Sequence, residues 1–286
     1  MTALAAPRFA LSTRQFYWLL ILPAAAMMFG FYLYPIAKVL WISVTEPRPG
    51  LDNYQRLLDS ESVQRVLWVT ARIGVTTTAL ALVLGYAVAY AMVHAGGRTL
   101  RWLTFFVLFP LWISVLVRAF AWVTLLRSNG LVNQGLLNLG LIAEPLALVR
   151  NELGVTIGMV HYMIPFAVLP LYSSMRSIDL RLVAAARGLG AGPLQAFLRV
   201  FLPLSLPGIV GAGILVFIFS LGFYVTPAIL GGGRILMVAE YIGVQILNTL
   251  RWGLGAMLAT TLLVSVLLLM AALGRLVNLR RLFGTA

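Results

Sequence analysis

The 286-residue sequence has no cysteine and few charged residues. Without cysteine the chain forms no disulfide, no thiolate metal site and no cysteine nucleophile. Only 10% of its residues are charged and 61% are apolar, whereas soluble domains average about 25% and about 45–50%. This composition excludes an ordinary soluble domain. A mean hydropathy of +0.97 over this length predicts several membrane crossings.

Six apolar runs are long enough to cross a bilayer, which takes about 20 predominantly apolar residues. They cover residues 16–37, 66–93, 102–126, 153–175, 204–224 and 254–274. The first run follows arginines, as a secretory signal does, but it is too long for one and no small-residue cleavage site follows it. We therefore expect an all-α integral membrane protein with six transmembrane helices, in which residues 1–286 form a single domain and the first run is a retained anchor.

Acidic residues are scarce, since 8 Asp and Glu stand against 21 Lys and Arg, for a net charge of +13. When the amino terminus, residues 94–101, residues 176–203 and the carboxyl tail are placed on one side, that side carries eleven arginines and one acid, Asp179. The opposite segments carry seven arginines and seven acids. Because Lys and Arg accumulate on the cytoplasmic side, we expect both termini in the cytoplasm. The charge is then a topology signal, and we expect no nucleic-acid partner.

The longest cytoplasmic segment, residues 176–203, predicts two short helices along the membrane surface. Asp179 is a suitable N-cap for a helix over residues 180–189, which Gly190 would end. A second, amphipathic helix is expected over residues 194–201. The product is a helix, a glycine turn and another helix.

Small residues and prolines mark this segment further. Pro203 and Pro207 are expected to break the second helix where it reaches the membrane. Ala184, Ala185 and Ala186 give the first helix a face with almost no side chains. Such a face allows close approach by another protein, but small residues also let a helix pack within its own bundle, and both interpretations stay open.

The same segment resembles a known signature. The stretch AAARGLGAGPLQAFLRVFLPLSLPGI is similar to the loop of permease subunits of binding-protein-dependent ABC importers, written as EAA, three residues, Gly, nine residues, Ile-x-Leu-Pro. The matching positions are Ala184, Ala185, Ala186, Gly190, Val200, Leu202 and Pro203. Two further stretches, residues 109–142 and 220–233, look like segments of the polyamine and opine branch of that family.

The resemblance implies that the loop is a coupling helix seated in a cleft of an ATP-hydrolysing subunit. Ala184 stands where the family usually has Glu, and Gly188 stands where the polyamine branch often has Asp. The polar contacts would then come from Arg181 and Arg187. The coupling residues implied are Arg181, Ala184, Ala185, Ala186, Arg187, Gly188 and Gly190.

The resemblance also implies a type I importer permease fold in the bacterial inner membrane. The chain would form half of a pore for ATP-driven uptake of a small polar nitrogenous solute, such as a polyamine or an opine. Its partners would be a second, different permease subunit, two ATPase subunits and an extracytoplasmic solute-binding protein. ATP and magnesium would bind the ATPase subunits, and this chain would carry no cofactor or metal.

Two arginines fall within the apolar runs, where a charge is costly by about 2.5–3.5 kcal/mol at a helix centre. Arg72 lies near the outer edge, so its guanidinium is expected to reach the interface. Arg118 lies deeper and shares a helical face with Trp122, which favours a role in the path. The residues predicted to line the path are Arg118, Trp122, Tyr162, Phe223, Tyr224 and Thr226.

No Asp or Glu lies within the six runs, although a cation that crosses an apolar bundle needs carboxylates or aromatic faces. Two explanations stay open. Either a sibling subunit supplies the acid, or the cargo carries a carboxylate or phosphonate that meets Arg118. Pro227 either breaks the fifth helix or marks its exit. Residues 231–247 are expected to form an outer loop that acts as a gate or as a ledge for the binding protein.

Other functional classes are weaker. An enzyme needs convergent acid, base or metal groups, whereas His94 and His161 have no carboxylate or second His at ligand spacing. We expect His161 to form an interhelical hydrogen bond. The sequence also has no glycine-rich phosphate-binding motif with a lysine. An ion-coupled carrier, which uses buried acids or interrupted repeats, and a membrane scaffold remain the alternatives.

Overall fold

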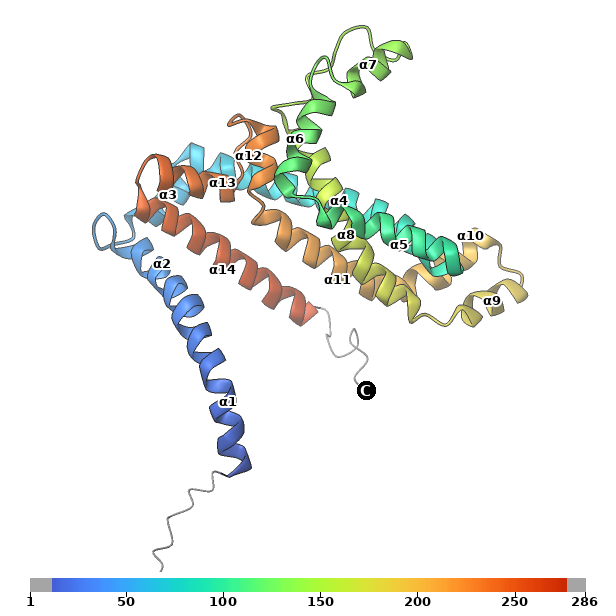
Figure 1. The fold of residues 1–286 in the computed structure, drawn as a ribbon, viewed down its shortest axis with the longest axis horizontal. Helices are drawn as coiled ribbons and strands as arrows, with labels where there is room; N and C mark the ends of the chain where they lie inside the picture. The colour runs from blue at the N-terminus through green and yellow to red at the C-terminus, as the bar shows by residue number, and fades with distance from the viewer. Residues whose placement is uncertain (1–11, 277–286) are drawn as a thin grey trace, which may run out of the picture.

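The computed structural model describes residues 12–276, and within this part the chain is helical with no strand. Figure 1 shows long helices bundled side by side, with short helices at both ends. Six helical segments of the described chain are long and apolar enough to cross a membrane: Tyr17–Thr45, Glu61–His94, Val115–Asn138, Glu152–Arg176, Pro193–Leu221 and Trp252–Ala272. The expectation of an all-α architecture with six transmembrane helices is confirmed.

Three long helices form the centre of the bundle, namely α4 (Glu61–His94), α8 (Glu152–Arg176) and α11 (Leu202–Leu221). Small residues let them approach closely. A Cβ added to Gly85 of α4 would lie 2.9 Å from the Cβ of Ala167, and one added to Gly208 of α11 would lie 2.5 Å from that of Ser174. Because lipid tails are as apolar as leucine, such close packing contributes strongly to association inside a membrane.

The predicted third span is not one helix. α5 (Gly97–Trp112) ends two residues after Pro110, and α6 (Val115–Leu126) begins only after an extended Ile113 and Ser114. α7 (Leu131–Asn138) follows and projects outward with α6 in Figure 1. The expectation of a continuous helix over residues 102–126 is wrong, because the mean hydropathy stays high across a break that contains Ser114 as its one polar residue.

The fifth span is continuous through Pro203 and Pro207, contrary to the predicted break at these prolines. α10 (Pro193–Ala196) passes into a π-helical turn, η2 (Phe197–Phe201), and then into α11. Pro203 lies in the first turn of α11, and the wider π turn just before it adjusts the hydrogen-bond register, with the Leu202 N–H bonded to the Phe197 carbonyl. Neither Pro203 nor Pro207 therefore ends the helix.

The remaining elements frame the bundle. α1 (Thr13–Met28), η1 (Phe29–Leu33) and α2 (Tyr34–Thr45) extend the first span beyond the predicted run, and α14 (Trp252–Leu276) packs along α2. α3 (Asp52–Asp59), α12 (Val225–Gly231), α13 (Val238–Gly243) and the π turn η3 (Val244–Asn248) complete the described chain. α3, α12 and α13 lie toward one end of the long helices, and α9 (Leu180–Gly188) and α10 lie at the other end (Figure 1).

Candidate coupling helix and translocation path

The predicted coupling helix is present as α9 (Leu180–Gly188). The Asp179 carboxylate caps it, with Oδ1 accepting a hydrogen bond of 2.9 Å from the Arg181 N–H. Gly190 follows with a φ of +92°, a left-handed conformation that costs glycine little. The predicted cap, helix and glycine turn are confirmed, and the helix ends one residue before the predicted Leu189.

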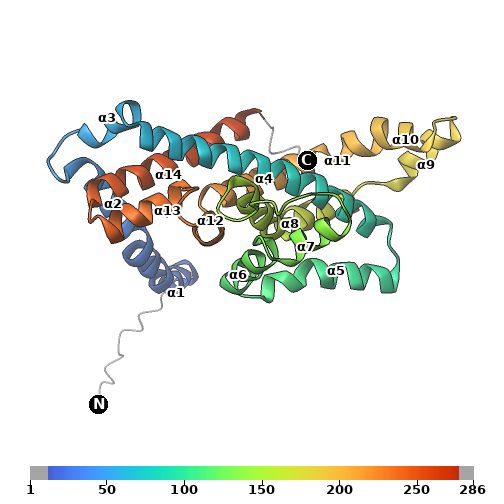
Figure 2. The same ribbon diagram turned by 90° about the horizontal axis from the view of Figure 1, so that it is seen from above.

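No residue of α9 is buried. Ala184 and Ala185 are exposed, and Leu189 just beyond the helix is 90% exposed. Figure 2 shows α9 and α10 projecting past the ends of the long helices α4 and α5. Val183 attaches α9 to the main apolar cluster, and Ala186 beside it is half-buried, whereas Ala184 and Ala185 are left uncovered by the chain's own described helices.

Arg118 lies in the first turn of α6 and is only 8% exposed. Its guanidinium carbon lies 4.4 Å from the centre of the Tyr162 ring on α8, a cation–π geometry that stabilises a buried cation. Its Nε and Nη1 atoms are buried and have no hydrogen-bond partner. The described chain thus holds the charge in place and leaves these two donor atoms unsatisfied.

A second contact joins α6 to α8 beside Arg118. The indole Nε1–H of Trp122 donates a hydrogen bond of 3.2 Å to Nδ1 of His161. The predicted interhelical role of His161 is confirmed. Trp122, like Arg118, is therefore fixed by α8.

An aromatic row continues from α8 to the end of α11. The Tyr162 ring lies 4.5 Å from that of Phe223 and stacks on Phe166 at 5.7 Å, and Phe166 meets Phe219 at 5.2 Å between ring centres. A groove of about 360 Å³ opens here, lined by Tyr162, Met163, Phe166, Ile218, Phe219, Gly222 and Phe223. Phe166 and Phe219 are additions to the predicted set, and their spacing of four residues from Tyr162 and Phe223 is the signal that would have found them.

The last two predicted path residues have different surroundings. Tyr224 precedes α12 and is 46% exposed. Thr226 is buried, and its methyl lies 2.7 Å from the position of a Cβ on Gly158 of α8. Thr226 therefore packs α12 on α8 and lies apart from the aromatic row. Pro227 occupies the first turn of α12, where its missing N–H costs nothing, so the helix breaks at residues 222–224 rather than at this proline.

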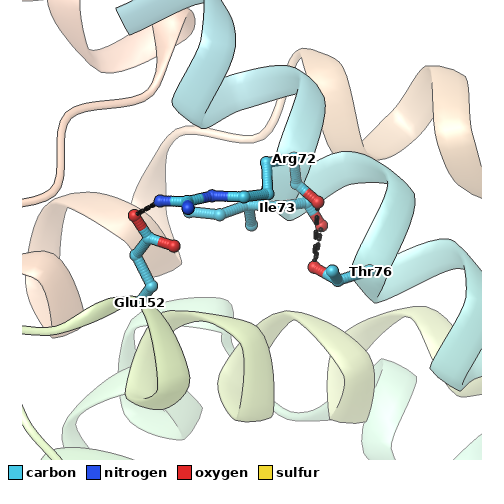
Figure 3. Close-up of polar contacts among 4 residues, drawn as sticks. All are labelled: Arg72, Ile73, Thr76 and Glu152. Atoms are coloured by element: carbon cyan, nitrogen blue, oxygen red, sulfur yellow. Dashed lines mark hydrogen bonds and ion pairs between the residues drawn. The ribbon is translucent and has the colours of Figure 1, made fainter. Parts of the chain in front are cut away.

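Arg72 has a partner that the sequence did not reveal. Its guanidinium forms an ion pair with Glu152 of the first turn of α8, and Figure 3 shows the two side chains meeting between α4 and α8. The Thr76 hydroxyl donates to the Arg72 and Ile73 carbonyls at 3.0 and 3.1 Å. Arg72 is about half exposed and joins two central helices. That its guanidinium reaches the membrane interface stays a prediction.

Glu240 of α13 is the functional candidate that sequence reasoning missed. It is only 7% exposed, and its Oε2 atom is buried with no hydrogen-bond partner. Burial raises the pKa of this carboxyl from 4.5 to about 7, because the charged form loses its hydration. The hydropathy pattern placed Glu240 in an outer loop, where an acidic residue is ordinary and does not indicate a functional site.

A model of the binding-protein-dependent transport system inner membrane components matches residues 81–282. The chain belongs to this family. Like the other members of the family of inner membrane components, it is a multi-pass membrane protein that serves transport rather than catalysis. Within residues 12–276 no group of three or more His, Asp or Glu side chains is placed to hold a metal ion.

Several relatives of known annotation share this family. The spermidine/putrescine transport system permease protein PotB of Escherichia coli (strain K12) is 36% identical over 74% of this chain and 77% of its own length. PotB of Haemophilus influenzae is 33% identical over 84% and 79%. The trehalose transport system permease protein SugB of Mycobacterium tuberculosis is 30% identical over 72% of both chains.

Solved structures of ABC transporters have the same fold. A chain of a bacterial transporter involved in import of the acidic polysaccharide alginate matches with a TM-score of 0.70 at 18% identity, over 91% of this chain and 94% of that one. A chain of the alginate transporter in complex with its alginate pentasaccharide-bound periplasmic protein matches with a TM-score of 0.74, over 92% and 95%. The type I importer permease fold expected for this inner membrane component is confirmed.

Proposed function

We propose that the chain forms half of the translocation path of an ATP-driven importer. The other half is a second, different permease subunit, and two ATPase subunits bind ATP and magnesium on the cytoplasmic side. A solute-binding protein delivers the cargo from outside. The observation that carries this proposal is α9, a helix with no buried residue and with Ala184 and Ala185 exposed, which projects beyond the long helices.

In this proposal α9 docks on an ATPase subunit through its small face. Ala184, Ala185 and Ala186 permit close approach. Gly188 and Gly190 add no side chain at the end of the helix, and the exposed Leu189 between them offers an apolar contact. The exposed Arg181 and Arg187 supply the polar contacts. With α9 in the cytoplasm, the positive-inside distribution puts both termini there too, and the whole chain acts as one membrane domain.

The proposed cargo is a solute with protonated amines, such as a polyamine. The identity of 33–36% with spermidine/putrescine permeases supports this class, and the row of Tyr162, Phe166 and Phe223 offers aromatic faces to a cation. Trp122 and Tyr224 flank that row in the proposed path, whereas Thr226 supports it by packing. The unsatisfied donors of Arg118 would meet an acid of the second permease or a carboxylate of an opine-like cargo.

Co-purification tests the proposed ATPase contact. Ala185→Trp puts a large ring on the uncovered face of α9, so we expect it to reduce recovery of the ATPase subunit at least tenfold. The control is Ala143→Trp, at an exposed small residue between α7 and α8. Equal recovery with both variants would contradict the proposal, and transport by the purified chain without nucleotide would instead indicate an ion-coupled carrier.

A further inference from the structure

Glu240 is a buried carboxyl without a partner near the end of the bundle that carries α3 and α12. No described hydrogen bond or ion pair involves it, and Oε2 is enclosed. An isolated buried carboxylate is costly unless a cation or hydrogen-bond donors meet it. The residues that face Glu240 from neighbouring elements therefore indicate which ligand it could bind.

The register of α13 is fixed by contacts on one side. The Val238 N–H donates a hydrogen bond of 2.8 Å to the Thr70 hydroxyl of α4. Val238, Tyr241 and Ile242 join the apolar cluster formed with α4 and α14. At about 100° per residue, given 3.6 residues per turn, Glu240 lies on the opposite face of α13 from these three side chains.

The face of Glu240 is turned toward Tyr224. Gly243 follows Glu240 by three residues and so shares its face. A Cβ on Gly243 would lie 3.2 Å from Cε2 and 3.7 Å from the hydroxyl oxygen of Tyr224. α12, which Tyr224 precedes, also packs against α13. The face of α13 that carries Glu240 thus lies against Tyr224, and Phe223, the chain neighbour of Tyr224, contacts Tyr162 of the aromatic row.

We propose that Glu240 and Tyr224 form a subsite for a protonated amine of the cargo. The carboxylate accepts N–H bonds from the ammonium group, and the half-exposed ring of Tyr224 stabilises its charge. This inference rests on the proposed function and deepens it, since it supplies from this chain the acid that the six apolar runs lack. A neutral or purely anionic solute would leave Oε2 unpaired and gain nothing here.

Uptake kinetics of the assembled importer in proteoliposomes test the subsite, with putrescine and spermidine as probes. We expect Glu240→Gln to raise the KM for both amines at least tenfold and Glu240→Asp, which keeps the charge, to raise it less than threefold. Glu144→Gln, at an exposed acid between α7 and α8, is the matched control and should behave as wild type. A KM for Glu240→Gln equal to that of the control would overturn the subsite.

A second measurement on the unmodified importer does not depend on a variant folding. A hydrophobic carbodiimide labels buried carboxyls, and mass spectrometry reports labelling of Glu240. Excess putrescine should reduce labelling of Glu240 at least threefold and leave labelling of the exposed Glu144 unchanged, which controls for amide coupling of the amine to activated carboxyls. 1,4-Butanediol, its uncharged analogue, should change neither. Equal labelling with and without putrescine would refute the subsite.

The two proposals fail in different ways. If the unmodified importer transports neither amine, the proposed cargo class is wrong. If it transports them and Glu240→Gln does so with an unchanged KM, the cargo class stands and the subsite alone is wrong.

Discussion

At the residue scale, three charged side chains of the bundle differ in their burial and in their partners. Arg118 lies on the Tyr162 ring with unsatisfied donors, and Glu240 has no polar partner within the described chain. Arg72, by contrast, is paired with Glu152 and half exposed. Because a buried unpaired charge costs far more than an exposed pair contributes, the first two are the functional candidates and the third is structural.

Removing the charge of Arg118 should impair transport. We expect Arg118→Gln to lower the rate of amine uptake about tenfold, equivalent to about 1.4 kcal/mol, because its free donors no longer meet their partner. Arg127→Gln, at an exposed arginine at the end of α6, should have no effect. Uptake of cationic and acidic candidates is measured in parallel, and equal uptake of both by variant and wild type would remove Arg118 from the path.

The raised pKa of Glu240 predicts a pH-dependent stability. The pKa of Glu240 is 4.5 in the unfolded chain and about 7 in the fold, so the folded state favours the protonated carboxyl. The free energy of unfolding is therefore highest below pH 4.5 and falls as the pH rises to 7. The cost above pH 7 is about 3 kcal/mol. Glu240→Gln should therefore melt at a higher temperature than wild type at pH 8 in detergent and at the same temperature near pH 4.5. A constant difference across this range would contradict the burial of an unpaired carboxyl.

The role of an individual residue could be predicted where it depends on the sequence close to that residue. The cost of a charge in an apolar run identified Arg118, and the absence of a metal-ligand pattern left His161 as a hydrogen-bonding group, which its bond from Trp122 confirms. Glu240 and the partner of Arg72 could not be predicted. Both depend on which distant elements pack together, and Arg72 and Glu152 are 80 residues apart.

At the scale of elements, caps and turns were predictable and helix breaks were not. The Asp179 cap and the Gly190 turn follow from local chemistry, and α9 ends within one residue of its predicted end. The break between α5 and α6 and the continuity through Pro203 escaped prediction. In both cases the backbone hydrogen bonds determine whether the helix continues, and the hydropathy of the side chains does not report them.

Close packing of α4 on α8 gives a stability prediction. Gly85→Val should destabilise the protein by about 1–3 kcal/mol, because even a Cβ at this position would lie 2.9 Å from the Cβ of Ala167. Gly211→Val on α11 is the control, since nothing lies within 4 Å of a Cβ there. Thermal unfolding of the two variants in detergent measures the difference, and equal melting temperatures would show that α4 and α8 have room between them.

At the scale of the whole molecule, the chain is an inner membrane component for which we propose a different task at each end of the bundle. α9 projects at one end, and α12 and α13, which carry the region of Tyr224 and Glu240, lie toward the other (Figure 1). An arginine excess in the segments around α9 and balanced charge in the opposite segments agree with this polarity. The account therefore requires ATP on the α9 side and cargo from the other.

Amine uptake by the complete importer in proteoliposomes tests that requirement most directly. With the solute-binding protein outside, putrescine should accumulate only when ATP is supplied on the side of α9, and Ala185→Trp should abolish this accumulation while Ala143→Trp preserves it. Accumulation without ATP, or uptake that Ala185→Trp leaves unchanged, would contradict the account.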